Sequence, residues 1–189
     1  MVETTVIENG TIFTMAKDGK VIQRGNVVIQ GDKIAELGSE VSAKNYSVDR
    51  RLDAKNKAVI PGLVNSHVHS TIFSRGAIED LILAKGMDKS LEEFYYPMMS
   101  MLTPEDVYRE AILAYVEMIR SGTTCVNDMY RHITSCAEAA EDVGIRALIS
   151  GEASDLTPGQ ETLQDNENAF KMKNNAADGR VKIWFGAEW

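Results

Sequence analysis

The pattern of apolar and polar positions divides the chain into two parts. In residues 1–57, short apolar runs alternate with turn-forming dipeptides, which is typical of a small β-sheet domain. Asn9-Gly10 and Gly31-Asp32 each lie between two such runs, and the sequence predicts a two-residue hairpin turn at both places. Another strand is predicted within residues 46–53, and residues 54–57 form a polar linker.

From residue 58 onward the period changes, and predicted strands alternate with predicted helices. Thr103-Pro104, followed by two acidic residues, indicates a helix start, and Gly144 indicates a helix end. Strands followed regularly by helices predict a parallel sheet. The predicted strands are residues 58–69, 123–128, 145–150 and 181–186, and the predicted helices are residues 103–120, 132–143 and 161–173.

Four strand–helix units are half of a (β/α)8 barrel, which needs about 250 residues. We therefore predict an α/β protein in which residues 58–189 form the first half of a TIM-type barrel and the C-terminal half of the barrel is absent. The alternative is a doubly wound open sheet, but the Gly-x-Gly-x-x-Gly loop typical of that fold does not occur.

The candidate chemistry lies at the carboxyl end of residues 58–69, an apolar run that reads as a buried strand. His67 and His69 end this run, and side chains two positions apart on a strand point the same way, so the two imidazoles can converge on one metal ion. The alternative is a pair of hydrogen-bonded core histidines. Cys125 and Cys136 form no Cys-x-x-Cys motif and are expected to be buried free thiols.

Composition limits the classes of partner. The chain has 189 residues, 44% of them hydrophobic and 25% charged, as in an ordinary globular protein. Its formal net charge of −8 argues against nucleic acid or an anionic membrane as the main partner. No basic segment with an apolar core stands at the start, and no apolar run reaches the roughly 20 residues of a membrane span. A cytoplasmic location is the default expectation.

Four blocks carry a resemblance to a known family: residues 59–69, with Pro61-Gly62 and both histidines, and residues 73–76, 102–107 and 120–130. Together they resemble the amidohydrolase superfamily, in the branch that holds S-adenosylhomocysteine/5'-methylthioadenosine deaminases, guanine deaminases and triazine chlorohydrolases. The resemblance covers only the N-terminal portion of such enzymes. It implies that residues 1–57 belong to a small composite β-sandwich, which in that family also includes residues from the far C-terminus.

The resemblance also implies the activity. The expected reaction is that of an aminohydrolase or deaminase, in which a metal-activated water attacks a C–N bond of a heterocyclic or amidine substrate. The implied cofactor is a divalent metal, zinc before iron, held by His67 and His69 with further histidines and an aspartate from later strands. The family's acid/base glutamate also lies beyond Trp189, so no catalytic residue is expected within this chain, which should be inactive alone. The alternative is a non-catalytic binding or assembly protein on the same scaffold, and a homodimer is possible in either case.

Four residues are candidates for substrate binding. Arg75 follows the histidine strand in a loop, and Lys89 stands with Ser90 where the adenosine-type deaminases have Glu-Trp, which favours an anionic or carbonyl-bearing substrate. Glu188 could contact a cationic amidine or amine, and Trp189 could stack on a ring. A solvent-exposed structural role is the alternative for Arg75 and Lys89.

Two other polar residues have structural alternatives that compete with functional ones. His132, the remaining histidine, lies at a helix start where the family has no ligand, which favours a solvated or capping role. Asp128 ends the second barrel strand and could contact the pocket or cap the following helix.

Overall fold

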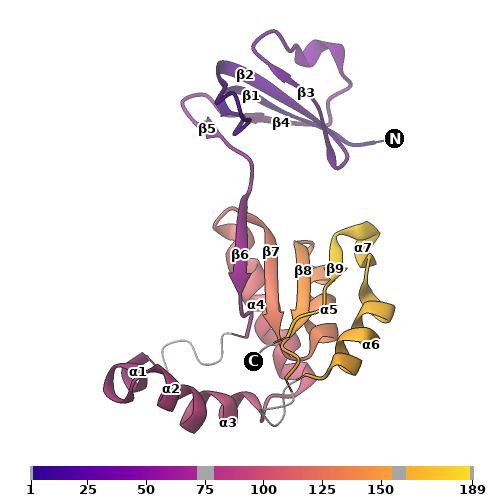
Figure 1. Ribbon diagram of the computed structural model, residues 1–189. Coiled ribbons are helices and arrows are strands. Elements are labelled where there is room, and N and C mark those ends of the chain that lie inside the picture. Colours follow the sequence, from indigo (N-terminus) through magenta and orange to yellow (C-terminus); the bar gives the residue numbers. More distant parts are fainter. Residues whose placement is uncertain (1, 72–78, 155–160, 188–189) are drawn as a thin grey trace. The chain divides into compact units, whose positions relative to one another are not determined.

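The structure is a computed structural model that describes residues 2–71, 79–154 and 161–187 (Figure 1). The chain forms two compact units, Met1–Pro61 and Gly62–Trp189, and each is described by itself. Both contain a β-sheet, and helices pack on the sheet of the second unit, so the chain has a mixed α/β fold. Among the described helices, none is long and apolar enough to cross a membrane.

The first unit is a five-stranded sheet. The main path has the order β3-β2-β1-β4, and β5 also pairs with β1. β2 is antiparallel to both of its neighbours, whereas β4 and β5 run parallel to β1. The described residues contain no second sheet that would make this unit a sandwich. Its elements are β1 (Thr4–Phe13), β2 (Val21–Gln30), β3 (Lys33–Gly38), the 3-10 helix η1 (Ala43–Asn45), β4 (Arg50–Asp53) and β5 (Ala58–Val59).

The two predicted hairpin turns have different outcomes. Gly31, with φ of 58°, does turn the chain between β2 and β3, since Gln30 pairs with Lys33. The prediction at Asn9-Gly10 is wrong, because β1 continues through both residues and only its register with β2 shifts there. The positive φ that Asn tolerates serves here for a bulge instead of a turn. The next position, residue 10, has room only for glycine, because a Cβ there would lie 2.5 Å from Val59 Cγ2 on β5.

The second unit contains a parallel sheet of four strands in the order β6-β7-β8-β9. This order equals the chain order and does not reverse among the described strands, as a doubly wound sheet would require. The predicted alternation of strands and helices is confirmed. The elements are β6 (Leu63–Val68), α4 (Pro104–Arg120), β7 (Thr123–Tyr130), α5 (Ile133–Val143), β8 (Arg146–Gly151), α6 (Leu163–Lys173), α7 (Ala176–Gly179) and β9 (Val181–Ile183).

Helices α4, α5 and α6 cover one face of this sheet (Figure 1). α4 begins as predicted, with a capping box in which Thr103 and Asp106 exchange hydrogen bonds between side chain and backbone. Its buried face packs into a single apolar cluster with Val126 of β7 and Ile149 of β8. The opposite face of the sheet carries no helix among the described elements.

Two features of the region before α4 differ from the prediction. Residues 58–69 are not one buried strand: β5 belongs to the first sheet, and β6 begins only after Pro61-Gly62. Leu63 and Val64 are 53% and 67% exposed, because β6 is the edge strand of the described sheet. A series of short helical turns then leads toward α4, where no helix was predicted. These are α1 (Glu79–Lys85), α2 (Met87–Ser90), a π-helical turn (Leu91–Tyr95) and α3 (Tyr96–Met99).

Candidate metal centre

The two histidines lie together at the carboxyl end of β6. Their ring centroids are 4.9 Å apart with an interplanar angle of 81°. The strand is irregular just before them, since its register with β7 shifts between Asn65 and Val68, and Asn65 Oδ1 accepts a hydrogen bond from the His67 backbone N–H at 3.3 Å. His67 is exposed and His69 is partly buried. The sequence spacing therefore produces adjacent imidazoles.

The backbone of the neighbouring strand holds the ring of His69. Its Nδ1 lies 2.5 Å from the carbonyl oxygen of Met129 on β7. A carbonyl oxygen only accepts hydrogen bonds, so Nδ1 carries a proton, and in the neutral imidazole Nε2 then keeps its lone pair. A bond from one ring nitrogen to a carbonyl or carboxylate is the usual support of a metal-binding histidine, because it fixes both the tautomer and the ring orientation.

Two tyrosines form a chain of ring contacts that begins at His69. The ring of Tyr130, which ends β7, lies 5.2 Å from that of His69, and the ring of Tyr95 lies 6.1 Å from that of Tyr130. Burial raises the pKa of both tyrosines, so their hydroxyls stay protonated at neutral pH. Tyr95 comes from the π-helical turn, an element that the sequence analysis did not predict.

Asp128 anchors the segment that follows the histidines. It is fully buried and accepts hydrogen bonds from the Ser70 backbone N–H at 3.1 Å and from the Tyr115 hydroxyl of α4 at 2.5 Å. Burial raises the pKa of its carboxyl. It does not cap α5, so that predicted role is wrong, and it instead joins α4 to the chain beside His69. Contact with a substrate pocket stays a prediction.

Two buried charged residues at the ends of β7 and β8 were missed by the sequence analysis. Glu152 directly follows β8, and its Oε1 lies 3.5 Å from His69 Nδ1. Arg131 directly follows β7, is 3% exposed, and its guanidinium has no hydrogen-bond acceptor among the described residues. The signal available in the sequence was their position within three residues of the end of a predicted strand, because barrel enzymes carry functional groups at the carboxyl ends of their strands.

None of the other predicted residues that the structure describes contacts the histidine pair. Lys89 is exposed on α2, whereas Arg75, Glu188 and Trp189 lie outside the described residues. His132 stands at the N-cap position of α5 without a capping side-chain bond, and its Nε2 contacts the Leu102 carbonyl at 3.1 Å. Within the described ranges, no cluster of three His, Cys, Asp or Glu residues is arranged to hold a metal ion.

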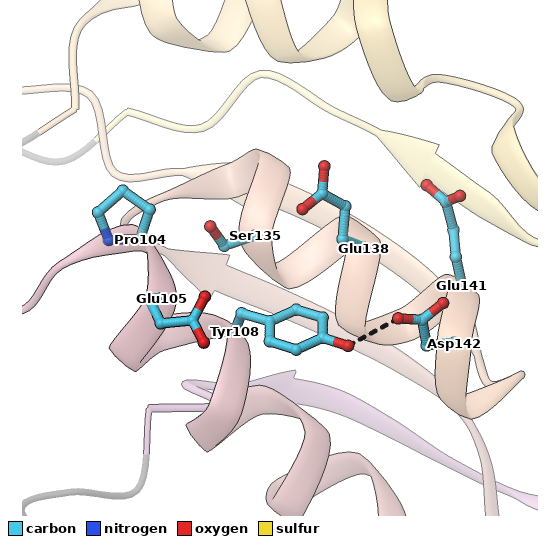
Figure 2. Close-up of a pocket in the computed structure, with 7 residues that line it drawn as sticks. All are labelled: Pro104, Glu105, Tyr108, Ser135, Glu138, Glu141 and Asp142. Carbon is cyan, nitrogen blue, oxygen red and sulfur yellow. Dashed lines mark hydrogen bonds between the residues drawn. The ribbon is translucent and has the colours of Figure 1, made fainter.

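A separate pocket lies between α4 and α5 (Figure 2). It is acidic, with Glu105, Glu138, Glu141 and Asp142 in its lining, and the Tyr108 hydroxyl donates a 2.7 Å hydrogen bond to Asp142. Lys173 Nζ lies 3.4 Å from Glu138 and 3.1 Å from Glu141, so part of this negative charge is already compensated. Neither histidine of the pair lines this pocket.

Comparisons with known proteins agree with the sequence resemblance. The sequence model of the "Amidohydrolase family" matches residues 58–189. The chain is 40% identical over 186 residues to a 5'-deoxyadenosine deaminase of Methanosarcina mazei, and 36% identical to a 5-methylthioadenosine/S-adenosylhomocysteine deaminase of Caldanaerobacter subterraneus. Each alignment covers 96% of this chain but 41% of the relative.

A solved structure shows the same fold. An adenosine deaminase from Xanthomonas campestris with bound zinc superposes with a TM-score of 0.83 at 25% identity, covering 97% of this chain and 42% of that protein. The chain thus spans about two fifths of the length of the proteins that it matches. The predicted similarity to the N-terminal portion of such enzymes is confirmed.

Proposed function

This chain belongs to the amidohydrolase family, and we propose that the protein containing it is a metal-dependent aminohydrolase. The reaction replaces an amino group on a heterocyclic or amidine carbon by oxygen from water and releases ammonia. The relatives named as deaminases favour an enzyme over a non-catalytic binding protein on the same scaffold.

The observation that carries the proposal is the pair formed by His67 and His69. Two imidazoles lie side by side at the carboxyl end of a parallel strand, which is the end where barrel enzymes carry their active sites. The Nδ1–H of His69 is engaged by Met129, so its Nε2 is free to bind a metal.

The donor set suits zinc, and iron is the second choice. Zinc binds histidine nitrogen readily, and a catalytic zinc usually has three protein ligands and an open position. This chain would supply two of these ligands, His67 and His69, with Met129 orienting the second. We place the remaining ligands and the acid/base glutamate in the part of the protein outside this chain. When bound, the metal supplies a water that is activated for attack at neutral pH.

The same reasoning extends to the architecture. We propose that residues 58–189 are the first half of a (β/α)8 barrel and that residues 1–57 are part of a small composite sandwich. The support is the sequential parallel order of β6 to β9 and the 41% of the relatives' length that the chain spans. Further polypeptide would then cover the exposed edge strand β6.

For the substrate we propose a small heterocyclic amine. The relatives' names make adenine nucleosides the first compounds to test. Lys89, Arg75, Glu188 and Trp189 remain proposed substrate contacts. The exposure of Lys89 on α2 leaves its ammonium group accessible to a ligand.

The test uses the intact protein, purified without chelators. Elemental analysis should find about one equivalent of zinc or iron, and 5'-deoxyadenosine or 5'-methylthioadenosine should release ammonia. The double variant His67→Ala/His69→Ala should lose both the metal and the activity. His132→Ala is the matched control, because it removes a histidine whose ring bonds to Leu102 and should leave the metal content unchanged. A wild-type protein that purifies metal-free would overturn the proposal.

A further inference from the structure

Glu152 is placed to act on the proposed metal centre through His69. It lies just beyond the carboxyl end of β8 and is 5% exposed. Its backbone N–H donates a 3.3 Å hydrogen bond to the Tyr130 carbonyl, which ties it to the end of β7. Its carboxylate oxygen Oε1 lies 3.5 Å from His69 Nδ1. The ends of three neighbouring strands therefore meet around one imidazole nitrogen.

Two acceptors approach the Nδ1–H group of His69, and they act differently. The Met129 carbonyl, at 2.5 Å, accepts the hydrogen bond. Glu152, at 3.5 Å, is too distant for a strong hydrogen bond, so it acts mainly through its negative charge. A negative charge beside Nδ1–H makes the opposite nitrogen, Nε2, a stronger electron donor.

A second buried charge, of opposite sign, lies at the end of the neighbouring strand. Arg131 directly follows β7 and is 3% exposed. Both charges influence the pKa of Tyr95 and Tyr130, which Glu152 raises and Arg131 lowers. A positive charge in this region reduces the cost of burying the Glu152 carboxylate.

We propose that Glu152 is a positioning residue of the metal centre. Together with the Met129 carbonyl it fixes the Nδ1–H tautomer of His69 and strengthens Nε2 as a metal ligand. It does not bind the metal itself. This inference rests on the proposed function, since it assumes that His69 is a ligand.

The test is the zinc affinity of the intact protein, measured by competition with a chromophoric chelator. Glu152→Gln keeps the shape of the side chain and removes its charge, so the Kd for zinc should rise about 10- to 100-fold. The stoichiometry at saturating zinc should stay unchanged. Glu167→Gln is the matched control: it removes a carboxylate that is ion-paired with Lys171 on α6, and it should leave the Kd within about twofold.

Three results separate the possibilities. Unchanged zinc affinity in folded Glu152→Gln would overturn the inference and leave the proposed function intact. Loss of zinc even at saturation would also overturn it, because Glu152 would then be a ligand. A wild-type protein that binds no zinc or iron would instead contradict the proposed function.

A second pair of variants covers the case in which Glu152→Gln does not fold. Glu152→Asp retains the charge that Glu152→Ala removes, so the aspartate variant must bind zinc more tightly than the alanine variant. Equal affinities of the two variants would overturn the inference. A purely structural role of Glu152 would change the stability of the metal-free protein without changing the zinc Kd of its folded fraction.

Discussion

Gly62, just before β6, lies where the backbone passes close to Thr124 of β7, and this contact allows a sharp prediction. A Cβ added at Gly62 would lie 2.8 Å from Thr124 Cβ and still closer to its Oγ1 and Cγ2. Rotation of the threonine moves Oγ1 and Cγ2 but not Cβ, which is fixed to the backbone. Gly62→Ala should therefore push β6 away from β7.

The size of the effect follows from the distances. Ordinary contact begins at 3.4 Å, so the strands must separate by about 0.6 Å. The hydrogen bond from Leu63 N–H to the Gly122 carbonyl, now 2.9 Å, would lengthen to about 3.5 Å and be largely lost. Overpacking costs about 1–3 kcal/mol and one such bond about 1 kcal/mol, so we expect Gly62→Ala to destabilise this strand pair by about 2 kcal/mol.

Hydrogen exchange of the intact protein measures this locally. A loss of about 2 kcal/mol corresponds to roughly 30-fold faster exchange of the amides at the start of β6. Because exchange reports the opening of each segment separately, this measurement does not require β6 to be the first part of the protein to unfold. Thr124→Gly removes the colliding side chain, so the double variant should recover most of the protection, less the roughly 0.5–1 kcal/mol that glycine costs inside a strand. Unchanged exchange in Gly62→Ala, or no recovery in the double variant, would refute the reasoning.

Three further predictions concern α4 and the buried Asp128 to which it is bonded. Tyr115→Phe removes the tyrosine hydroxyl that donates to buried Asp128 and should lower the free energy of unfolding by about 1–3 kcal/mol in a denaturant titration. Thr103→Ala removes the exposed N-cap of α4 and should lower the same free energy by about 1 kcal/mol. Burial raises the pKa of Asp128 above its ordinary 3.8, so this group favours folding below that value, and the contribution is lost as pH rises through the folded pKa. Asp128→Asn should therefore be less destabilising at pH 7 than near pH 4; equal effects at both pH values would contradict this.

The sequence analysis succeeded where the signal is local. Thr103 and Pro104 start α4, and Gly144 ends α5 in the left-handed conformation, because caps depend on residues within one turn of the helix. The alternation of strands and helices after residue 58 followed from periodicity. The prediction failed at Asn9-Gly10, because the same positive φ suits a turn and a bulge. Contact with Val59 on β5, far away in sequence, decides between them.

For the candidate site, the sequence by itself determined that His67 and His69 share one end of a strand, since the two-residue period of a strand requires it. It could not determine what surrounds them. The carbonyl of Met129, the carboxylate of Glu152 and the buried charge of Arg131 come from the ends of other strands. Only the parallel pairing of β6, β7 and β8 brings those ends together, because strand register is set by packing of the whole sheet and not by the local pattern.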